Sequence, residues 1–187
     1  MNFCTACGAS VSYCIPAGDN RQRYMCTHCG TIHYQNPRIV AGCILHWHDR
    51  ILLCRRAIEP RLGYWTLPAG FMENGETTRE AAAREALEEA EAIAEDLTLY
   101  AIYNLRHIDQ VYMMFRGQLR DGFAHPGQES LETRLFYQED IPWDTLAFTV
   151  VRETLQRFFA ERPKGRFPVH YADVWRQADG QVQVQYA

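Results

Sequence analysis

Three glutamates in one short segment carry the strongest chemical signal in this sequence. Residues 77 to about 94 are almost all strong helix formers, with no glycine or proline among them. At about 100° per residue, Glu85, Glu88 and Glu89 share one face of that helix. Oxygen ligands at this density suit Mg²⁺ or Mn²⁺. The segment predicts a divalent-cation site; the alternative is a solvated acidic face in which Arg84 pairs with a neighbouring glutamate.

Four of the seven cysteines form two C-x-x-C pairs. Cys4 pairs with Cys7 and Cys26 with Cys29, and a glycine follows each pair. Two such knuckles can supply four thiolates to one closed, tetrahedral Zn²⁺ site, as in a zinc ribbon. Such a site leaves no position for water, so we expect it to fold a segment that is too poor in apolar residues to fold alone. The other three cysteines are expected to be one peripheral thiol and two core residues, namely Cys14, Cys43 and Cys54.

Short apolar runs around the acidic helix predict the sheet that positions it. Strands are expected over residues 39–45, 51–54, 97–103, 110–119 and 131–137. A second amphipathic helix is expected over residues 148–159. Residues 181–186 alternate as a strand would, but such a tail can equally be frayed or form a dimer contact.

The start and the packing face of the acidic helix can also be predicted. Thr77 followed by Glu80 fits a capping box, which places the first turn. The side chains opposite the carboxylates are expected to pack on the sheet, and they are Ala83, Ala86, Leu87 and Ala90.

Composition limits the partners. The net charge is −4, the wrong sign for a protein that binds nucleic acid mainly through phosphates, and the first 38 residues hold only scattered arginines. A nucleic-acid partner is therefore not expected, nor is a membrane, since no apolar run approaches the roughly 20 residues of a spanning helix. The metal-like motif begins at Cys4, which leaves no room for a targeting segment, so a cytoplasmic location is expected.

The acidic helix and the loop before it resemble the Nudix box, G-x5-E-x7-R-E-U-x-E-E-x-G-U, where U is aliphatic. The matching residues are Gly70, Glu76, Arg84, Glu85, Ala86, Glu88, Glu89 and Ala92. Glu91 is the one departure, because the family has glycine there. From this replacement we expect the helix to continue through Ala94.

The resemblance implies an α/β fold, a Nudix α/β/α sandwich with a mixed sheet, preceded by a small zinc-ribbon domain. It assigns Glu85, Glu88 and Glu89 to catalytic Mg²⁺ or Mn²⁺, and gives Arg84 and Glu76 supporting roles. The family usually adds a further glutamate as base or ligand, for which Glu129 and Glu132 are the candidates. The expected domains are a zinc ribbon over residues 1–34, a Nudix hydrolase domain over 35–160 and a C-terminal extension over 161–187.

Motifs outside the box narrow the resemblance. The serine-glutamine-proline-tryptophan signature of NADH pyrophosphatases is absent. Residues 65–71, 126–130, 134–136 and 141–148 look like the zinc-ribbon Nudix group that includes plant plastid FAD pyrophosphatases. This implies FAD or ADP-ribose as substrate and AMP as product, although Arg106-His107-Ile108 stands where many ADP-ribose pyrophosphatases carry a proline.

Two classes of function remain open at this level. One is a dinucleotide pyrophosphatase, whose substrates could also include NADH or diadenosine polyphosphates. The other is a binding protein that keeps the Nudix fold without turnover. Several aromatic residues near the predicted site could stack on a base, although most are expected to be core: Tyr64, Trp65, Phe71, Tyr112 and Phe115.

Overall fold

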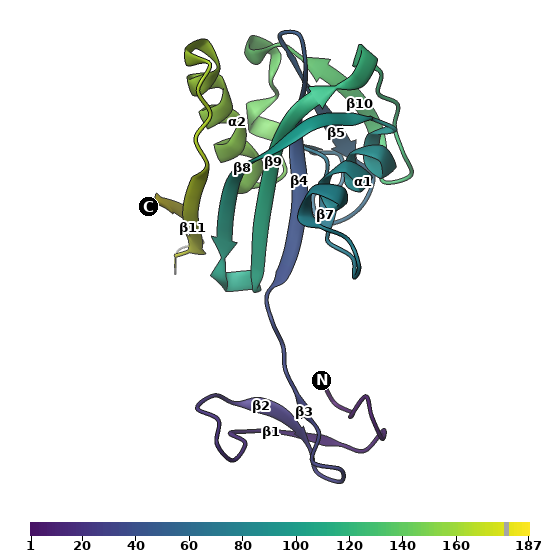
Figure 1. Cartoon of the computed structure of the whole chain (residues 1–187), viewed down its shortest axis with the longest axis vertical. Coiled ribbons are helices and arrows are strands. Elements are labelled where there is room, and N and C mark those ends of the chain that lie inside the picture. The colour runs from purple at the N-terminus through teal and green to yellow at the C-terminus, as the bar shows by residue number, and fades with distance from the viewer. Residues whose placement is uncertain (178–179) are drawn as a thin grey trace. The chain divides into compact units, whose positions relative to one another are not determined.

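The computed structural model describes residues 1–177 and 180–187. The chain forms two compact units, Met1–Pro37 and Arg38–Ala187. In the first unit, three short strands form an antiparallel sheet in the order β1-β2-β3 (Figure 1). They are β1 (Val11–Cys14), β2 (Arg23–Cys26) and β3 (Ile32–His33).

In its described residues, the second unit contains a nine-stranded sheet and two α-helices. The strands are β4 (Arg38–Trp47), β5 (Arg50–Arg56), β6 (Trp65–Thr66), β7 (Ala69–Phe71), β8 (Ala94–Leu105), β9 (Gln110–Leu119), β10 (Ser130–Phe136), β11 (His170–Arg176) and β12 (Val182–Tyr186). The helices are α1 (Thr78–Ala90) and α2 (Thr149–Glu161). Five short 3₁₀ turns connect the elements: η1 (Arg106–Ile108), η2 (Arg120–Gly122), η3 (Gln138–Asp140), η4 (Trp143–Thr145) and η5 (Arg162–Lys164).

The sheet is mixed, with the order β10-β5-β4-β9-β8-β11-β12. The pairs β4–β9 and β8–β11 are parallel, and the other neighbours are antiparallel. Two short strands join outside this path, because β6 pairs with β5 and β7 with β4. The predicted strands are therefore present, and the strand β11 is one that the alternation in the sequence does not reveal.

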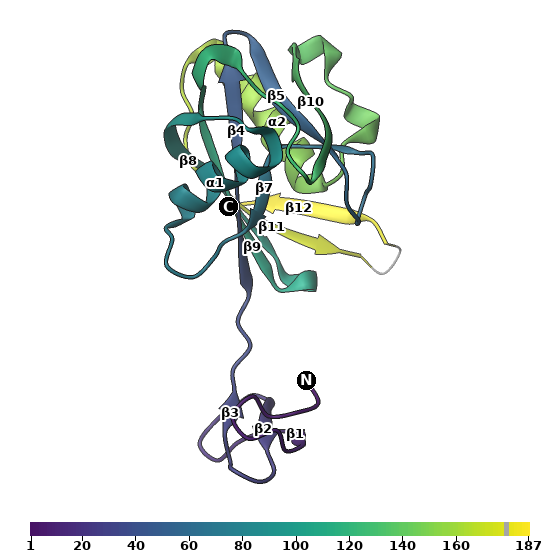
Figure 2. The same cartoon turned by 90° about the vertical axis from the view of Figure 1, so that its right-hand side faces the viewer.

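The two faces of the sheet carry separate hydrophobic cores. Along β4, Cys43 and Leu45 belong to the core that contains the alanines of α1, while Ile44 belongs to the core that contains the apolar residues of α2. This follows from the strand geometry, which directs successive side chains to opposite faces. The helices α1 and α2 accordingly cover opposite faces (Figure 2). The predicted α/β/α sandwich with a mixed sheet is confirmed.

The helix α1 begins as predicted but differs in its face and its end. The capping box is formed: the backbone N–H of Glu80 donates to the Thr77 hydroxyl and that of Thr77 to the Glu80 carboxylate. The prediction for Leu87 was wrong, since this residue is 54% exposed. Glu85 and Glu89 are buried in the face that packs on the sheet.

The prediction that the helix continues through Ala94 was also wrong. The helix ends at Ala90, and Glu91 follows in the left-handed conformation with φ of 46°. Its N–H and that of Ala92 still donate to the carbonyls of Leu87 and Ala86, which closes the helix end. A turn that favours glycine is therefore made here by a glutamate, and Ala94 already begins β8.

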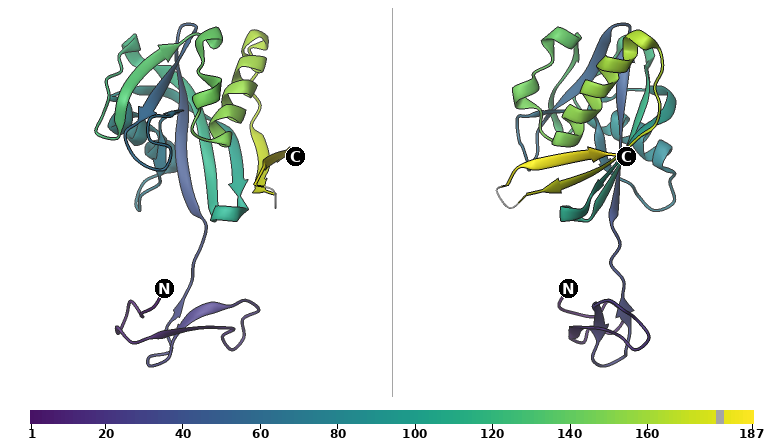
Figure 3. Two further views of the ribbon diagram at one scale, coloured as in Figure 1. Left: turned by 180° about the vertical axis from the view of Figure 1, so that it is seen from behind. Right: turned by 90° about the vertical axis from the view of Figure 1, so that its left-hand side faces the viewer.

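Residues 161–187 include two strands of the main sheet. The strand β11 pairs in parallel with β8, and β12 pairs with β11 (Figure 3). The alternating tail is thus a sheet strand. Within the described chain, no helix is long and apolar enough to cross a membrane.

Replacing Glu91 by glycine should stabilise the second unit. A non-glycine residue in the left-handed region costs roughly 1–2 kcal/mol, and the greater freedom of glycine in the unfolded chain offsets part of the gain. We expect Glu91→Gly to raise the free energy of unfolding by about 0.5–1 kcal/mol, measured by urea denaturation. Tryptophan fluorescence reports this unit alone, because Trp47, Trp65, Trp143 and Trp175 all lie in it.

A matched control is Leu87→Gly, a substitution at an exposed position within the same helix. It should lower the free energy of unfolding by about 1 kcal/mol, because glycine is a poor helix former. A decrease for Glu91→Gly as well would contradict the assignment of strain to this residue.

Candidate active site

The helix α1 places two carboxylates one turn apart on its buried face. Glu85 is 8% exposed and Glu89 is 6% exposed, whereas Glu88 lies at the solvent side. The capping box fixes where the helix starts, and the alanines next to the glutamates pack on the sheet, which together set this rotation. All three predicted glutamates line one cleft.

The short strand β7 receives these carboxylates. The backbone N–H of Ala69 donates to Oε2 of Glu89 at 3.2 Å. At Gly70, a Cβ atom would overlap the carboxylate of Glu85, so only glycine lets this group lie against the backbone. Gly70 is paired with Ala41 of the central strand β4, which holds this surface to the main sheet. The close approach explains the glycine of the motif as a packing requirement.

Arg84 holds the loop before α1 to the helix. Its guanidinium donates to both oxygens of Glu76, at 3.0 and 2.9 Å, and to the carbonyl of Phe71 at 3.1 Å. It also donates to Glu85 at 2.8 Å and to Glu88 at 3.1 Å. The hydrogen bonds from Arg84, with one from the backbone N–H of Glu73, lower the pKa of Glu76 to about 2. Glu76 is thus charged at all ordinary pH values and fixes Arg84 in place.

Burial has the opposite effect on the two glutamates of the packed face. Loss of water around the carboxylate raises the pKa of Glu89 to about 8, against the N–H of Ala69, which stabilises the charge. Burial also raises the pKa of Glu85, although Arg84 opposes the rise. Two desolvated carboxylates with raised pKa values are the environment in which a bound divalent cation most stabilises the charged forms. The donor set therefore fits Mg²⁺ or Mn²⁺.

The cleft has a volume of about 820 Å³ and a lining of acidic, basic and apolar groups. Its acidic part is lined by Glu73, Glu85, Glu88, Glu89 and Glu129. Basic side chains also line the cleft, namely Arg56, Arg61, Arg84, His107 and Arg176, and Arg84 lies among the glutamates. Apolar and aromatic residues from several strands and the start of α2 complete it, including Leu105, Tyr112, Phe148, Val150, Val174 and Val182. A cleft of this size and mixed lining suits a dinucleotide-sized ligand.

Of the two further glutamates, the structure brings only Glu129 to the cleft. The loop before it is tied to the end of α1, because the backbone N–H groups of His125 and Gly127 donate to the carbonyls of Ala90 and Glu89. Glu129 is close enough to Glu85 and Glu89 to raise the pKa of both. Glu132 lies outside the lining of the cleft and forms an ion pair of 3.7 Å with Arg55 on the surface.

Arg56 is a residue of the cleft that the sequence analysis missed. It ends β5 and is 9% exposed. Its Nε donates to the carbonyl of Pro60 at 2.9 Å, and its guanidinium lies 5.2 Å from the ring centre of Phe148. Its charge also lowers the pKa of Glu89. The available signal in the sequence was an arginine close to the apolar run of residues 51–54. An arginine there is rarely buried unless it has a partner, so its position makes it a candidate functional residue.

The aromatic candidates divide between cleft and core. Phe71 and Tyr112 line the cleft, as does Phe148, which was not among the candidates. Trp65 packs instead against Phe136, with ring centres 4.9 Å apart. Tyr64 and Phe115 also lie outside the lining, and Phe115 is buried on the face covered by α1.

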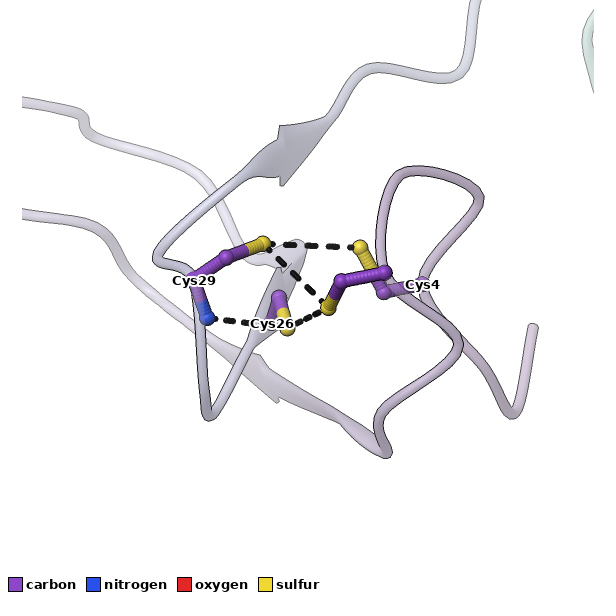
Figure 4. Close-up of side chains that lie close together, drawn as sticks. Cys4, Cys26 and Cys29 are labelled. Carbon is purple, nitrogen blue, oxygen red and sulfur yellow. Dashed lines mark hydrogen bonds between the residues drawn. The ribbon is translucent and has the colours of Figure 1, made fainter.

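The four paired cysteines of the first unit converge on one point. The Sγ atoms of Cys4, Cys7, Cys26 and Cys29 all lie within 4.8 Å of one another. Their closest contacts are 3.5–3.7 Å, near the edge length of roughly 3.8 Å that follows from four Zn–S bonds of about 2.3 Å. Figure 4 shows the sulfur atoms of the cluster facing one another. Among the residues that the structure describes, this is the only group of three or more histidine, cysteine, aspartate or glutamate side chains whose ligand atoms converge in this way.

The other cysteines lie as predicted. Cys43 and Cys54 are buried in the core, and Cys14 is partly exposed at the end of β1. Burial raises the pKa of the Cys43 thiol far above its ordinary range, as expected for a core residue.

Comparison with known proteins gives matches along most of the chain. The family model for the Nudix N-terminal zinc ribbon matches residues 2–35, and the model for the NUDIX domain matches residues 36–166. The crystal structure of a NUDIX hydrolase from Nitrosomonas europaea is 51% identical, with a TM-score of 0.91, over 94% of this chain and 100% of that one.

Curated relatives are more distant. The NAD-capped RNA hydrolase NudC of Photobacterium profundum is 26% identical over 163 residues, which are 83% of this chain and 58% of that protein. The ADP-ribose pyrophosphatase of Methanocaldococcus jannaschii is 29% identical over 113 residues, 58% of this chain and 67% of that protein. The chain thus spans less than two thirds of the length of the NudC relative.

The Glu76–Arg84 contact predicts a stability difference that depends on pH. The pKa of Glu76 in the folded state is about 2, below its ordinary value of 4.5. Its charged form therefore stabilises the fold fully above about pH 4.5, and this contribution is lost as the pH falls towards 2. We expect Glu76→Gln to lower the free energy of unfolding at pH 7, with a difference from the wild type that shrinks at pH 3. Urea denaturation followed by tryptophan fluorescence measures both values.

Glu139→Gln is the matched control, because Glu139 is an exposed residue outside the cleft. It should give no difference that changes with pH. A constant destabilisation by Glu76→Gln from pH 7 to pH 3 would show that the charge of Glu76 is not what stabilises the loop.

For the cysteine cluster, we expect about one zinc per chain by elemental analysis. Cys29→Ser should lose the zinc, because it removes one of four converging thiolates, whereas Cys14→Ser should keep it. A well-folded preparation without zinc, or equal zinc in both variants, would overturn the assignment.

Proposed function

Because the chain belongs to the Nudix hydrolase family, we propose that it cleaves the diphosphate of a nucleoside diphosphate linked to another moiety, with FAD or ADP-ribose as substrate. The observation that carries the proposal is the acidic end of the cleft. There Glu85, Glu88 and Glu89 lie together on α1, next to Glu129. The products are AMP and either FMN or ribose 5-phosphate.

The glutamates of α1 would hold the divalent ions. When bound, Mg²⁺ or Mn²⁺ neutralises diphosphate oxygens and lowers the pKa of a coordinated water. Buried Glu85 and Glu89 are the most constrained donors, since each lies against the backbone of β7. Glu88 is the exposed donor at the solvent side. Arg84, fixed by Glu76, keeps the loop and helix in register.

The remaining steps fall to side chains around this centre. Glu129 accepts the proton of the attacking water, whose oxygen forms a bond to one phosphorus. The bond from that phosphorus to the bridging oxygen breaks, and the other phosphate leaves with the electron pair. Arg56, buried beside Glu89, is placed to donate to a phosphate oxygen and to offset its charge.

A dinucleotide of the NAD type is the second candidate. It is favoured by the relatives named NAD-capped RNA hydrolase NudC, whose similarity extends over 83% of this chain. The cleft volume of about 820 Å³ accommodates either kind of dinucleotide. Diadenosine polyphosphates are a further alternative, and a Nudix-fold protein without turnover is disfavoured by the complete set of glutamates.

A substrate panel tests the proposal. The full chain is incubated with Mg²⁺ or Mn²⁺ and FAD, ADP-ribose, NADH, diadenosine polyphosphates or an NAD-capped oligoribonucleotide. Chromatography resolves AMP, or NMN for the capped oligoribonucleotide, whose adenosine stays in the RNA. We expect the highest kcat/KM for FAD or ADP-ribose. A preference for NADH or the capped oligonucleotide would replace the leading candidate by the second, and no turnover of any compound would refute the enzymatic proposal.

Variants in the same assay test the roles of the glutamates. Glu89→Gln should abolish turnover while the fold remains intact, because it removes a buried donor. Glu129→Gln should lower kcat by about 10²–10⁴-fold, the usual effect of losing a general base. Glu132→Gln discriminates between the two candidates, since a comparable loss in that variant, with Glu129→Gln active, would move the base to Glu132.

A further inference from the structure

The C-terminal hairpin forms one wall of the cleft. The NUDIX model ends at residue 166, and β11 and β12 lie beyond it. Three residues of the hairpin nevertheless line the same cleft as the glutamates of α1, and they are Val174, Arg176 and Val182. The hairpin lies against β8 in the views of Figure 3, as the strand register requires. A segment outside the matched family region therefore contributes to the candidate substrate site.

Strand register orders these residues into rows across the sheet. Val174 is opposite Leu105 in the parallel pair β8–β11, and Val184 is opposite Val174 in β12. Two residues beyond Val174, on the same face of β11, Arg176 is opposite Val182. His107 lies two residues beyond Leu105, in η1, and also lines the cleft. The outer row therefore consists of Arg176 and Val182, and His107 of the adjacent turn η1 lines the cleft with them.

The helix α2 covers the inner part of this face. The Thr154 hydroxyl donates to the Tyr103 hydroxyl at 3.2 Å, and the Tyr186 hydroxyl donates to Glu153 at 2.8 Å. Both tyrosines belong to the row of Ala172. Because α2 begins only at Thr149, it leaves the outer row to face the cleft beside Phe148 and Val150.

Arg176 differs from the other arginines of the cleft. Arg84 is bound to Glu76, Arg56 donates to Pro60, and Arg61 lies over the ring of Tyr64. In the part of the chain that the structure describes, the guanidinium of Arg176 has no such hydrogen bond, ion pair or ring contact. It offers several N–H donors to a ligand, next to the apolar surfaces of Val174 and Val182.

The geometry points to a specificity wall: His107, Arg176 and Val182 bind a planar heterocyclic ring of the substrate, at the end of the molecule away from the reacting phosphorus. The ring contacts Val182 and Val174 through its face, and Arg176 donates to its carbonyl or ring-nitrogen acceptors. This inference rests on the proposed function for the identity of the substrate. Adenine and a heterocyclic ring in the other half of the dinucleotide both have a flat face and such acceptors, and the binding experiment distinguishes between them.

Binding to the full chain tests the wall without requiring turnover. The dissociation constants of AMP, FMN and ribose 5-phosphate are measured by calorimetry for the wild type, Val182→Trp and Arg176→Ala. We expect each variant to weaken binding of AMP or FMN by about tenfold or more, the usual effect of losing a hydrogen bond from a charged group or of filling a pocket. Ribose 5-phosphate should be unaffected. A loss for AMP assigns the wall to adenine, and a loss for FMN assigns it to the second ring.

Two controls match these variants. Gln183→Trp places the same bulk on the opposite face of β12, and Arg166→Ala removes an exposed arginine outside the cleft. Both should bind all three ligands within twofold of the wild type. Circular dichroism melting confirms that every variant is folded.

The inference is overturned if Val182→Trp and Arg176→Ala both bind AMP and FMN as the wild type does, if the controls lose binding equally, or if the wild type binds neither ring. It is also distinguishable from failure of the proposed function. A wild type that binds a ring through Arg176 but hydrolyses no member of the substrate panel would refute the activity and retain the wall.

Discussion

The packing of two carboxylates against the backbone of β7 is the constraint on which the rest of the site depends. Glu85 and Glu89 lose most of their contact with water there, which raises the pKa of each. Such an arrangement is costly without a compensating charge. Arg84 supplies part of that compensation, and it can do so only because Glu76 anchors it from the other side. The negative charge that Arg84 leaves uncompensated makes this surface suitable for a cation.

The same constraint explains the small residues around the site. For the carboxylates to reach the sheet, α1 must lie close to it, and the helix accordingly packs through Ala81, Ala82, Ala86 and Ala90. The opposite face of the sheet has no such requirement. It is filled by large side chains such as Tyr100, Leu155 and Phe158, and gives the unit most of its apolar core. One face of the sheet thus lets a helix pack closely through alanines, and the other face is filled by large apolar side chains.

Much of this site could be predicted from the sequence, because its parts are close together in the chain. The spacing of Gly70, Glu76 and the glutamates of α1 gives their grouping directly, and the capping box gives the helix start. The rotation of α1 could not be predicted from polarity. Hydrophobicity predicts that Leu87 is buried and that Glu85 and Glu89 are exposed, whereas the structure has the reverse. A metal site requires polar groups inside, where the usual rule places apolar ones.

The parts that the sequence did not reveal depend on contacts between distant residues. Glu91 adopts a conformation that favours glycine because the chain must turn into β8 at that point. Arg56 ends β5 and Glu129 directly precedes β10, and only the pairing of Arg56 with Ser130 brings the two cleft residues together. The strand β11 is similarly hard to predict, because its partner β8 lies far from it in the sequence, with His170 paired to Ala101.

This last pairing has a consequence for the order in which the domain is completed during synthesis. The edge of β8 exposes unpaired backbone groups until β11 has left the ribosome, and a parallel partner so distant in sequence joins late. Gly70, Glu76 and the glutamates of α1 are close together in the chain, so this part of the cleft can form before β11 and β12 complete it. A nascent chain would therefore form the glutamate-lined part of the cleft before the part that β11 and β12 line.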